Sequence, residues 1–224
     1  LFPYTTLFRS GYIAVADIYK ELKNYDKAIE NYLVAVSKDE NNVDIKKDIA
    51  NCYHNKKDYD NALKYYNEVL AATSDDFNIK FNKALVLHAL NKYTEAIILY
   101  KELLSTRNEK VIKDNLNNAL VSRGHEYIKS GESADAIVDF KTAIKGGYTD
   151  GYVYYGLAKA YRELGDNTKA GENYEKAISI DPDKTLYSSE YSDFISSLYS
   201  KSAYVDAQNS NAELPAINIP MEEP

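Results

Sequence analysis

The chain has 224 residues, of which 45% are hydrophobic and 27% charged, as in ordinary globular proteins. Its net charge of −7 argues against a nucleic-acid partner, because such a partner needs a clustered basic face. The printed residues hold no run of 18 apolar residues, so none of them forms a candidate membrane segment. The single cysteine, Cys52, cannot form an internal disulfide and is expected to be a small packed residue of a helix.

The first ten residues, LFPYTTLFRS, share none of the pattern that follows them. They resemble translated sequencing-adapter DNA, so we interpret residues 1–10 as a non-native leader. On this interpretation the true N-terminus is missing, and any signal peptide or upstream domain is unknown. The default localisation is then cytoplasmic, with a periplasmic or lipid-anchored protein left open. The frequent Asn, Lys, Ile and Tyr are typical of an AT-rich bacterial genome.

After this leader, an alanine followed four residues later by an aromatic residue recurs five times. The pairs are Ala28/Tyr32, Ala62/Tyr66, Ala96/Tyr100, Ala136/Phe140 and Ala170/Tyr174, so the alanines are 34, 34, 40 and 34 residues apart. Twelve residues before each alanine stands another small residue: Ala16, Ala50, Ala84, Gly124 and Ala158. A fixed period of this length predicts a solenoid of stacked units in place of one closed core.

Each unit is predicted to be a hairpin of two helices. In residues 151–184, apolar residues at helical spacing are followed by Gly165 and Asp166, which favour the end of one helix and the start of the next. The second helix ends before Pro182. The small residues mark the point where the two helices cross closely. The predicted units are 9–42, 43–76, 77–110, 117–150 and 151–184.

Two further segments complete the predicted organisation. Residues 111–116 are six extra residues between the third and fourth units, and their apolar members predict an early start of the next first helix. Residues 185–200 carry an apolar stripe that predicts a C-terminal capping helix, with a partner-binding helix as the alternative. Residues 201–224 are polar, contain three prolines and are expected to be a disordered tail.

Over residues 11–184 this pattern resembles the tetratricopeptide repeat family. The resemblance implies an all-α fold, a right-handed superhelical solenoid of five hairpins with the capping helix, and a protein or peptide partner. It also implies that the first helix of each hairpin lines a concave groove. By that resemblance the expected peptide-binding residues are Lys47, Asn51, His54, Asn78, Asn82, His88, Asn118, His125 and Tyr155.

Asparagine suits such a groove, because its amide can bond both the N–H and the C=O of an extended peptide. The alternative interpretation is that these polar residues form only the solvated side of the solenoid. Some members of the family bind chaperone C-termini through a carboxylate clamp, and Lys47, Asn51 and Asn82 match three of its five positions. The other two positions fall on Asn118 and Ser122, which are not basic, so the predicted clamp is incomplete.

No pattern typical of catalysis occurs in the sequence. There is no glycine-rich phosphate loop, no HExxH and no CxxC, and the histidines are 34 and 37 residues apart. We therefore expect no catalytic residue, no cofactor and no metal, and a noncatalytic scaffold that binds a peptide or helix in its groove as a monomer or with weak self-association. Two alternatives stay open: an interaction domain of a larger enzyme whose catalytic part lies upstream, and a solenoid that self-assembles through its tyrosine-rich face.

Overall fold

The computed structural model describes the backbone of residues 2–210 and the side chains of residues 8–201. Over that range the chain forms eleven helices and no strand, which confirms the predicted all-α class. No helix in the described range is long and apolar enough to cross a membrane. The chain divides into two compact units, Leu1–Tyr148 and Thr149–Pro224.

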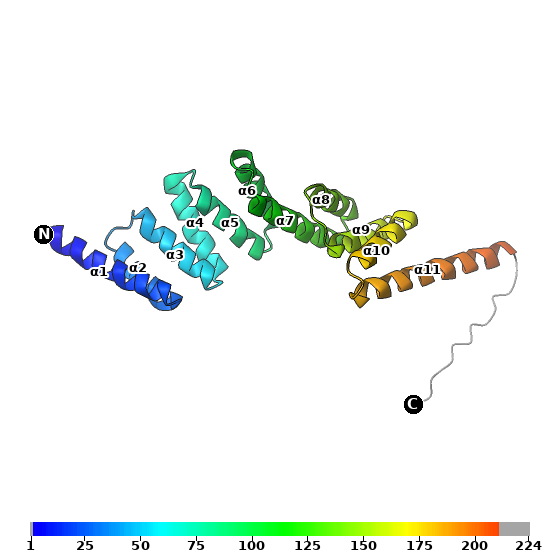
Figure 1. Ribbon diagram of the computed structural model, residues 1–224, viewed down its shortest axis with the longest axis horizontal. Coiled ribbons are helices and arrows are strands. Elements are labelled where there is room, and N and C mark those ends of the chain that lie inside the picture. The colour runs from blue at the N-terminus through cyan, green and yellow to red at the C-terminus, as the bar shows by residue number, and fades with distance from the viewer. Residues whose placement is uncertain (1, 211–224) are drawn as a thin grey trace, which may run out of the picture. The chain divides into compact units, whose positions relative to one another are not determined.

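The first unit consists of four helical hairpins in succession. Each helix packs against the next one along the chain (Figure 1), which is the arrangement of a solenoid. The hairpins are α1 (Phe2–Glu21) with α2 (Tyr25–Val36), α3 (Val43–Asn55) with α4 (Tyr59–Thr73), α5 (Phe77–Ala89) with α6 (Tyr93–Thr106), and α7 (Lys110–Lys129) with α8 (Ser133–Lys145).

The turn inside each hairpin is set by one residue in the left-handed region. These residues are Lys23, Lys57, Asn91 and Gly131, with φ between 57° and 81°. A polar residue follows directly in the first two hairpins, where the side chains of Asn24 and Asp58 accept backbone N–H bonds of 3.3 Å at the start of α2 and α4. The left-handed residue ends one helix and the cap begins the next.

The small residues of the sequence motif lie at the helix crossings, as predicted. Ala16, Ala50 and Ala84 on the first helices are fully buried, and so are the alanines opposite them on the second helices. The aromatic residues of the motif are buried beside them. In the fourth hairpin the crossing leaves no room for a Cβ: one added to Gly124 would lie 2.6 Å from a ring carbon of Phe140.

The extra residues 111–116 lengthen α7 at its N-terminal end, which confirms the expected early start. This helix has 20 residues, whereas α3 and α5 have 13 each, so it is longer by about 10 Å. Ile112 in the extension is only 1% exposed. Further along α7, the buried Asn117 donates a hydrogen bond of 3.1 Å to the carbonyl of Gly146, which fixes the chain after α8.

The N-terminal segment is helical and continuous with α1. The Arg9 side chain forms an ion pair with Asp39, and the ring of Phe8 meets that of Tyr12 at 4.9 Å. A continuous helix does not identify the origin of residues 1–10, so their interpretation as a non-native leader stays a prediction.

The second unit contains α9 (Gly151–Glu163), α10 (Asn167–Ile180) and α11 (Thr185–Ser210). Tyr187 and Phe194 of α11 are 1% and 2% exposed, and Phe194 packs on Tyr174 of α10. The helix expected over 185–200 therefore exists but continues to Ser210, so the expected boundary at residue 200 was ten residues too early. Residues 201–210 contain no proline or glycine to end the helix. The rest of the expected tail, 211–224, lies outside the described residues.

Candidate functional site

Polar side chains on the first helices connect consecutive hairpins of the first unit. Nζ of Lys20 on α1 lies 2.9 Å from Asp48 on α3, and Nδ2 of Asn82 on α5 donates to Oδ1 of Asn51 on α3 at 3.2 Å. Nε2 of His88 on α5 lies 3.3 Å from the hydroxyl of Ser122 on α7. We call these three contacts the polar ladder, formed by Lys20, Asp48, Asn51, Asn82, His88 and Ser122.

The buried tyrosine of the second hairpin holds the Asn51 contact of the ladder in place. The Tyr66 hydroxyl donates to Oδ1 of Asn51 at 2.8 Å and lies 3.2 Å from Nδ1 of His54. Burial raises the pKa of Tyr66, so its hydroxyl stays protonated and acts as a donor. The first hairpin has the same arrangement, since Tyr32 donates to Asp17.

The amides of Asn51 and Asn82 keep a donor and an acceptor for another molecule. Both contacts of Asn51 use its Oδ1, while Nδ2 of Asn51 and Oδ1 of Asn82 make no hydrogen bond within the described residues. Both residues are half-buried, and neither atom is among the buried side-chain atoms that lack a hydrogen-bond partner, so both are accessible to solvent. A fixed N–H donor beside a fixed C=O acceptor is complementary to the backbone of an extended peptide.

The positive charge expected for a carboxylate clamp is already neutralised. Nζ of Lys47 lies 2.9 Å from Asp76 and 3.7 Å from Asp44. The hydrogen bond to Asp76 raises the pKa of Lys47 against the opposing effect of burial, and the charges of Asp76 and Asp44 raise it further. The surroundings of Lys47 thus favour a neutral or basic ligand over a carboxylate.

The three histidines pack on aromatic rings of their own hairpins. His88 meets Tyr93 at 5.4 Å and His125 meets Phe140 at 5.0 Å, both edge to face. Burial lowers the pKa of His54 and of His88 below the ordinary value, so both are neutral at pH 7. In the described part of the chain, no group of three or more His, Cys, Asp or Glu side chains is placed to hold a metal ion.

The only cysteine offers no reactive thiolate. Cys52 is fully buried in α3, and burial raises the pKa of its thiol to about 11. The expectation of a small packed residue in a helix is confirmed, because Cys52 lies in the same buried cluster as Ile45 and Ile49.

The structure brings only part of the predicted site together. Asn51, His54 and Asn82 lie within one hydrogen-bonded group, while Asn78 and Asn118 are exposed on α5 and α7. Asp17 and Lys20 of α1 form a separate polar group with Tyr32 and Asp48. Neither was named among the expected groove residues, because these were listed only from the second hairpin onward.

Tyr155 belongs to the second unit and has a different environment. It is only 6% exposed, because Tyr187 of α11 stacks on it at 5.0 Å. The resemblance placed this position on the groove side without taking account of the helix that covers it. Tyr155 therefore packs under α11 and has little surface for a peptide.

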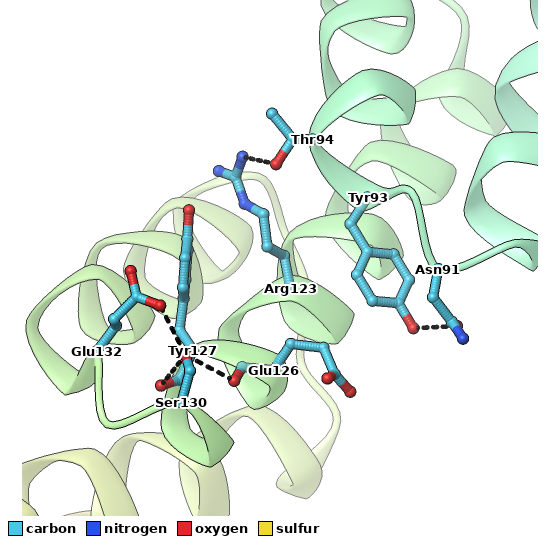
Figure 2. Close-up of a pocket in the computed structure, with 8 residues that line it drawn as sticks. All are labelled: Asn91, Tyr93, Thr94, Arg123, Glu126, Tyr127, Ser130 and Glu132. Atoms are coloured by element: carbon cyan, nitrogen blue, oxygen red, sulfur yellow. Dashed lines mark hydrogen bonds between the residues drawn. The ribbon is translucent and has the colours of Figure 1, made fainter.

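A separate polar pocket lies between the turn of α5 and α6 and the turn of α7 and α8. Figure 2 shows its lining residues, and its volume is about 340 Å³. Arg123 donates to both carboxylate oxygens of the buried Asp139 at 2.7 and 2.8 Å and to Thr94 at 3.2 Å. The Tyr93 hydroxyl donates to Asn91 at 2.7 Å. The bond from Arg123 to Thr94 joins the fourth hairpin to the third, so we interpret the pocket as part of their connection.

Comparison with protein-family models identifies this architecture. Models of the tetratricopeptide repeat match residues 14–77 and 48–110 in the first unit and residues 152–184 in the second. The chain belongs to the tetratricopeptide repeat family, and as such it is a protein–protein interaction scaffold.

Solved structures show the same fold. The chain is 20% identical to YrrB, with a TM-score of 0.56 over 79% of this chain and 88% of YrrB. For the MamA protein the identity is 17% and the TM-score 0.56, over 80% of this chain and 95% of MamA. A tetratricopeptide repeat protein from Parabacteroides merdae ATCC 43184 is 18% identical, with a TM-score of 0.56 over 94% of this chain and 82% of its own. No curated protein matches the chain.

Proposed function

We propose that this chain is a noncatalytic scaffold that binds an extended peptide of a partner protein along α3, α5 and α7. The observation that carries the proposal is the pair of amides at Asn51 and Asn82. Their contact, and the hydroxyl of Tyr66 behind them, fix a donor and an acceptor next to each other. A peptide that pairs with fixed groups pays a smaller ordering cost than one that binds mobile side chains.

The surroundings of the pair suit a peptide with polar and apolar side chains. Asn78 is exposed on α5, the helix of Asn82, and Asn118 is exposed on α7. Phe81, next to Asn82, is half-buried with its ring edge-to-face on Tyr100 at 6.3 Å, so it can contribute an apolar contact. The acidic neighbours of Lys47 favour a peptide without a carboxylate at that end.

The likeness to YrrB supports peptide binding as a use of this fold. YrrB is described as a tetratricopeptide repeat protein with an unusual peptide-binding site. We carry over the kind of ligand and not its position, because the two chains are only 20% identical.

The test begins with a peptide selected on the full chain from a random peptide library. Its affinity is then measured by calorimetry for the chain, for Asn82→Ala and for the control Asn67→Ala, which removes an exposed amide from α4. We expect Asn82→Ala to weaken binding about tenfold, which corresponds to about 1.4 kcal/mol, and Asn67→Ala to have no effect. Equal affinity of all three proteins would contradict the proposed site.

A second measurement separates this function from self-assembly. Light scattering over a concentration series should give one mass, that of the chain alone, if the scaffold binds as a monomer. A mass that rises with concentration, together with failure of every selected peptide to respond to Asn82→Ala, would favour the self-assembling solenoid instead.

A further inference from the structure

The polar pocket between the third and fourth hairpins (Figure 2) marks a departure from the repeat. Cys52 of α3 and Val86 of α5 each stand two residues after the small residue at the helix crossing. Both are 0% exposed, in buried clusters with the second helix of the preceding hairpin. In α7 the residue two after Gly124 is Glu126, which is exposed and lines the pocket. A carboxylate thus stands at this interface where the two earlier interfaces have a buried apolar side chain.

Arg123 gives the pocket no excess positive charge. It donates to both carboxylate oxygens of Asp139 at 2.7 and 2.8 Å, and Asp139 is only 4% exposed. Its third bond, of 3.2 Å, goes to the hydroxyl of Thr94. Because the bidentate carboxylate already neutralises the guanidinium, a further anion would gain little at Arg123.

Two further carboxylates line the pocket without a comparable partner. Oε1 of Glu126 lies 2.7 Å from Nζ of Lys129, but the two side chains are 50% and 71% exposed. Oε1 of Glu132 accepts a hydrogen bond of 2.7 Å from the neutral hydroxyl of Ser130. An exposed ion pair is weak and a hydroxyl brings no charge, so the pocket keeps a negative charge that attracts cations.

Two half-buried tyrosine rings line the pocket together with these carboxylates, Tyr93 from the third hairpin and Tyr127 from the fourth. Figure 2 shows Tyr127 edge-on, between Glu132 and Arg123 in that view. The central carbon of the Arg123 guanidinium lies 5.5 Å from the centroid of the Tyr127 ring, so this ring already attracts a cation of the chain itself. Aromatic rings combined with carboxylates suit a group that has an apolar stem and a cationic head.

We propose that this pocket binds a basic side chain, of lysine or arginine, from a partner protein. The cationic head pairs with Glu126 and Glu132, while the apolar stem lies against the ring of Tyr127. The volume of about 340 Å³ is near the lower end of the range of about 300–1,000 Å³ for small-molecule sites, so it suits a single side chain. The pocket includes neither Asn51 nor Asn82, so this binding does not depend on the proposed peptide site.

The test is a titration of the full chain, labelled with nitrogen-15, with four blocked tripeptides. Acetyl-Gly-Lys-Gly-amide and acetyl-Gly-Arg-Gly-amide carry the proposed ligand, and the same peptides with a central glutamine or glutamate are the neutral and acidic controls. The backbone amide of Gly131, in the turn between α7 and α8, reports binding by nuclear magnetic resonance. We expect the two basic peptides to shift this signal to saturation at millimolar concentration, and added salt to weaken their binding.

Two double variants separate the pocket from a general attraction of cations to an acidic chain. Glu126→Gln/Glu132→Gln removes both pocket carboxylates, and Glu30→Gln/Glu40→Gln removes two exposed ones elsewhere, with the same change in net charge. All four residues are exposed, so the melting temperature should stay unchanged. We expect the pocket variant to bind the basic peptides about tenfold more weakly and the control variant to bind them as the original chain does.

Equal affinity of the two double variants, or no response of the original chain to either basic peptide, would overturn the proposal. An equal response to the neutral peptide would also overturn it, because the charge of the ligand would then not matter. A stronger response to the acidic peptide would do the same, since it would place an anion on Arg123.

Discussion

Asn82 of α5 donates a hydrogen bond of 3.2 Å to Asn51 of α3, which lies 31 residues earlier in the chain. The contact joins two hairpins and also positions the amide atoms that we propose for peptide binding. Stability and peptide binding are therefore coupled at this point. A substitution near the contact should be tested for its effect on the free energy of unfolding and on peptide affinity.

The hydroxyl groups of two equivalent tyrosines should differ in their effect on stability. Tyr66 donates to Asn51 at 2.8 Å, whereas the hydroxyl of Tyr100 is buried with no hydrogen-bond partner among the described residues. Leu85 stands where Asn51 stands one repeat earlier. Tyr66→Phe should lower the free energy of unfolding by about 0.5–1.5 kcal/mol, and Tyr100→Phe should leave it unchanged or raise it. Urea denaturation measures both, and an equal loss for the two variants would contradict this arrangement.

Stability should fall between pH 7.5 and pH 5.5. Burial lowers the pKa of His54 and His88 in the folded chain, so the unfolded chain binds protons first as the pH falls below about 6.5. The contribution of both residues is complete above that pH and is lost as the pH falls through the folded pKa. Urea denaturation at the two pH values should show the loss, and the double variant His54→Gln/His88→Gln should show a smaller one. The same pH dependence in both proteins would assign the effect to other groups.

Replacing glycine by alanine should have opposite effects at two positions. A Cβ at Gly124 would lie 2.6 Å from the buried ring of Phe140, whereas at Gly171 the nearest atom outside its own helix is 3.9 Å away. We expect Gly124→Ala to destabilise by about 1–3 kcal/mol through overpacking. Gly171→Ala should stabilise by about 0.5–1 kcal/mol, since alanine favours a helix interior. Thermal unfolding of the two variants measures these changes in stability. Stabilisation by both Gly124→Ala and Gly171→Ala would mean that α7 and α8 cross less closely than described.

The repeat itself could be predicted from the sequence because its small and aromatic residues serve local packing. Ala28 and Tyr32 mark a helix crossing wherever they recur, so their spacing alone predicts the hairpins. The extension of α7 was also predictable, since Val111 and Ile112 continue an apolar helix pattern. These features depend on contacts between neighbours along the chain, which a period in the sequence records.

The candidate site was less predictable, because it depends on which polar atoms pair with one another. The resemblance to the family placed Asn51 and Asn82 on one face, but nothing in the sequence indicates that Oδ1 of Asn51 accepts from Tyr66 and Asn82 together. The burial of Tyr155 depends on where α11 packs, and residue spacing carries no such information. Similarly, residue spacing does not indicate that Ile18 of α1 is 60% exposed, because exposure depends on which helices pack beside it.

The turn at Lys57 should be improved by glycine. Lys57 has φ 65°, a region that costs residues with a Cβ about 1–2 kcal/mol. Lys57→Gly should raise the free energy of unfolding by roughly 0.5–1 kcal/mol, while Lys64→Gly inside α4 should lower it by about 1 kcal/mol. Urea denaturation of the two variants gives both values, and destabilisation by Lys57→Gly would argue against the left-handed turn.

The most direct test of peptide binding at the first helices is nuclear magnetic resonance of the side-chain amides. The full chain, labelled with nitrogen-15, is titrated with the peptide selected from the random library. We predict that the amide signals of Asn51 and Asn82 shift and saturate at the dissociation constant found by calorimetry, while that of Asn67 stays in place. Unchanged signals of Asn51 and Asn82 at saturating peptide would contradict the proposed function of this face.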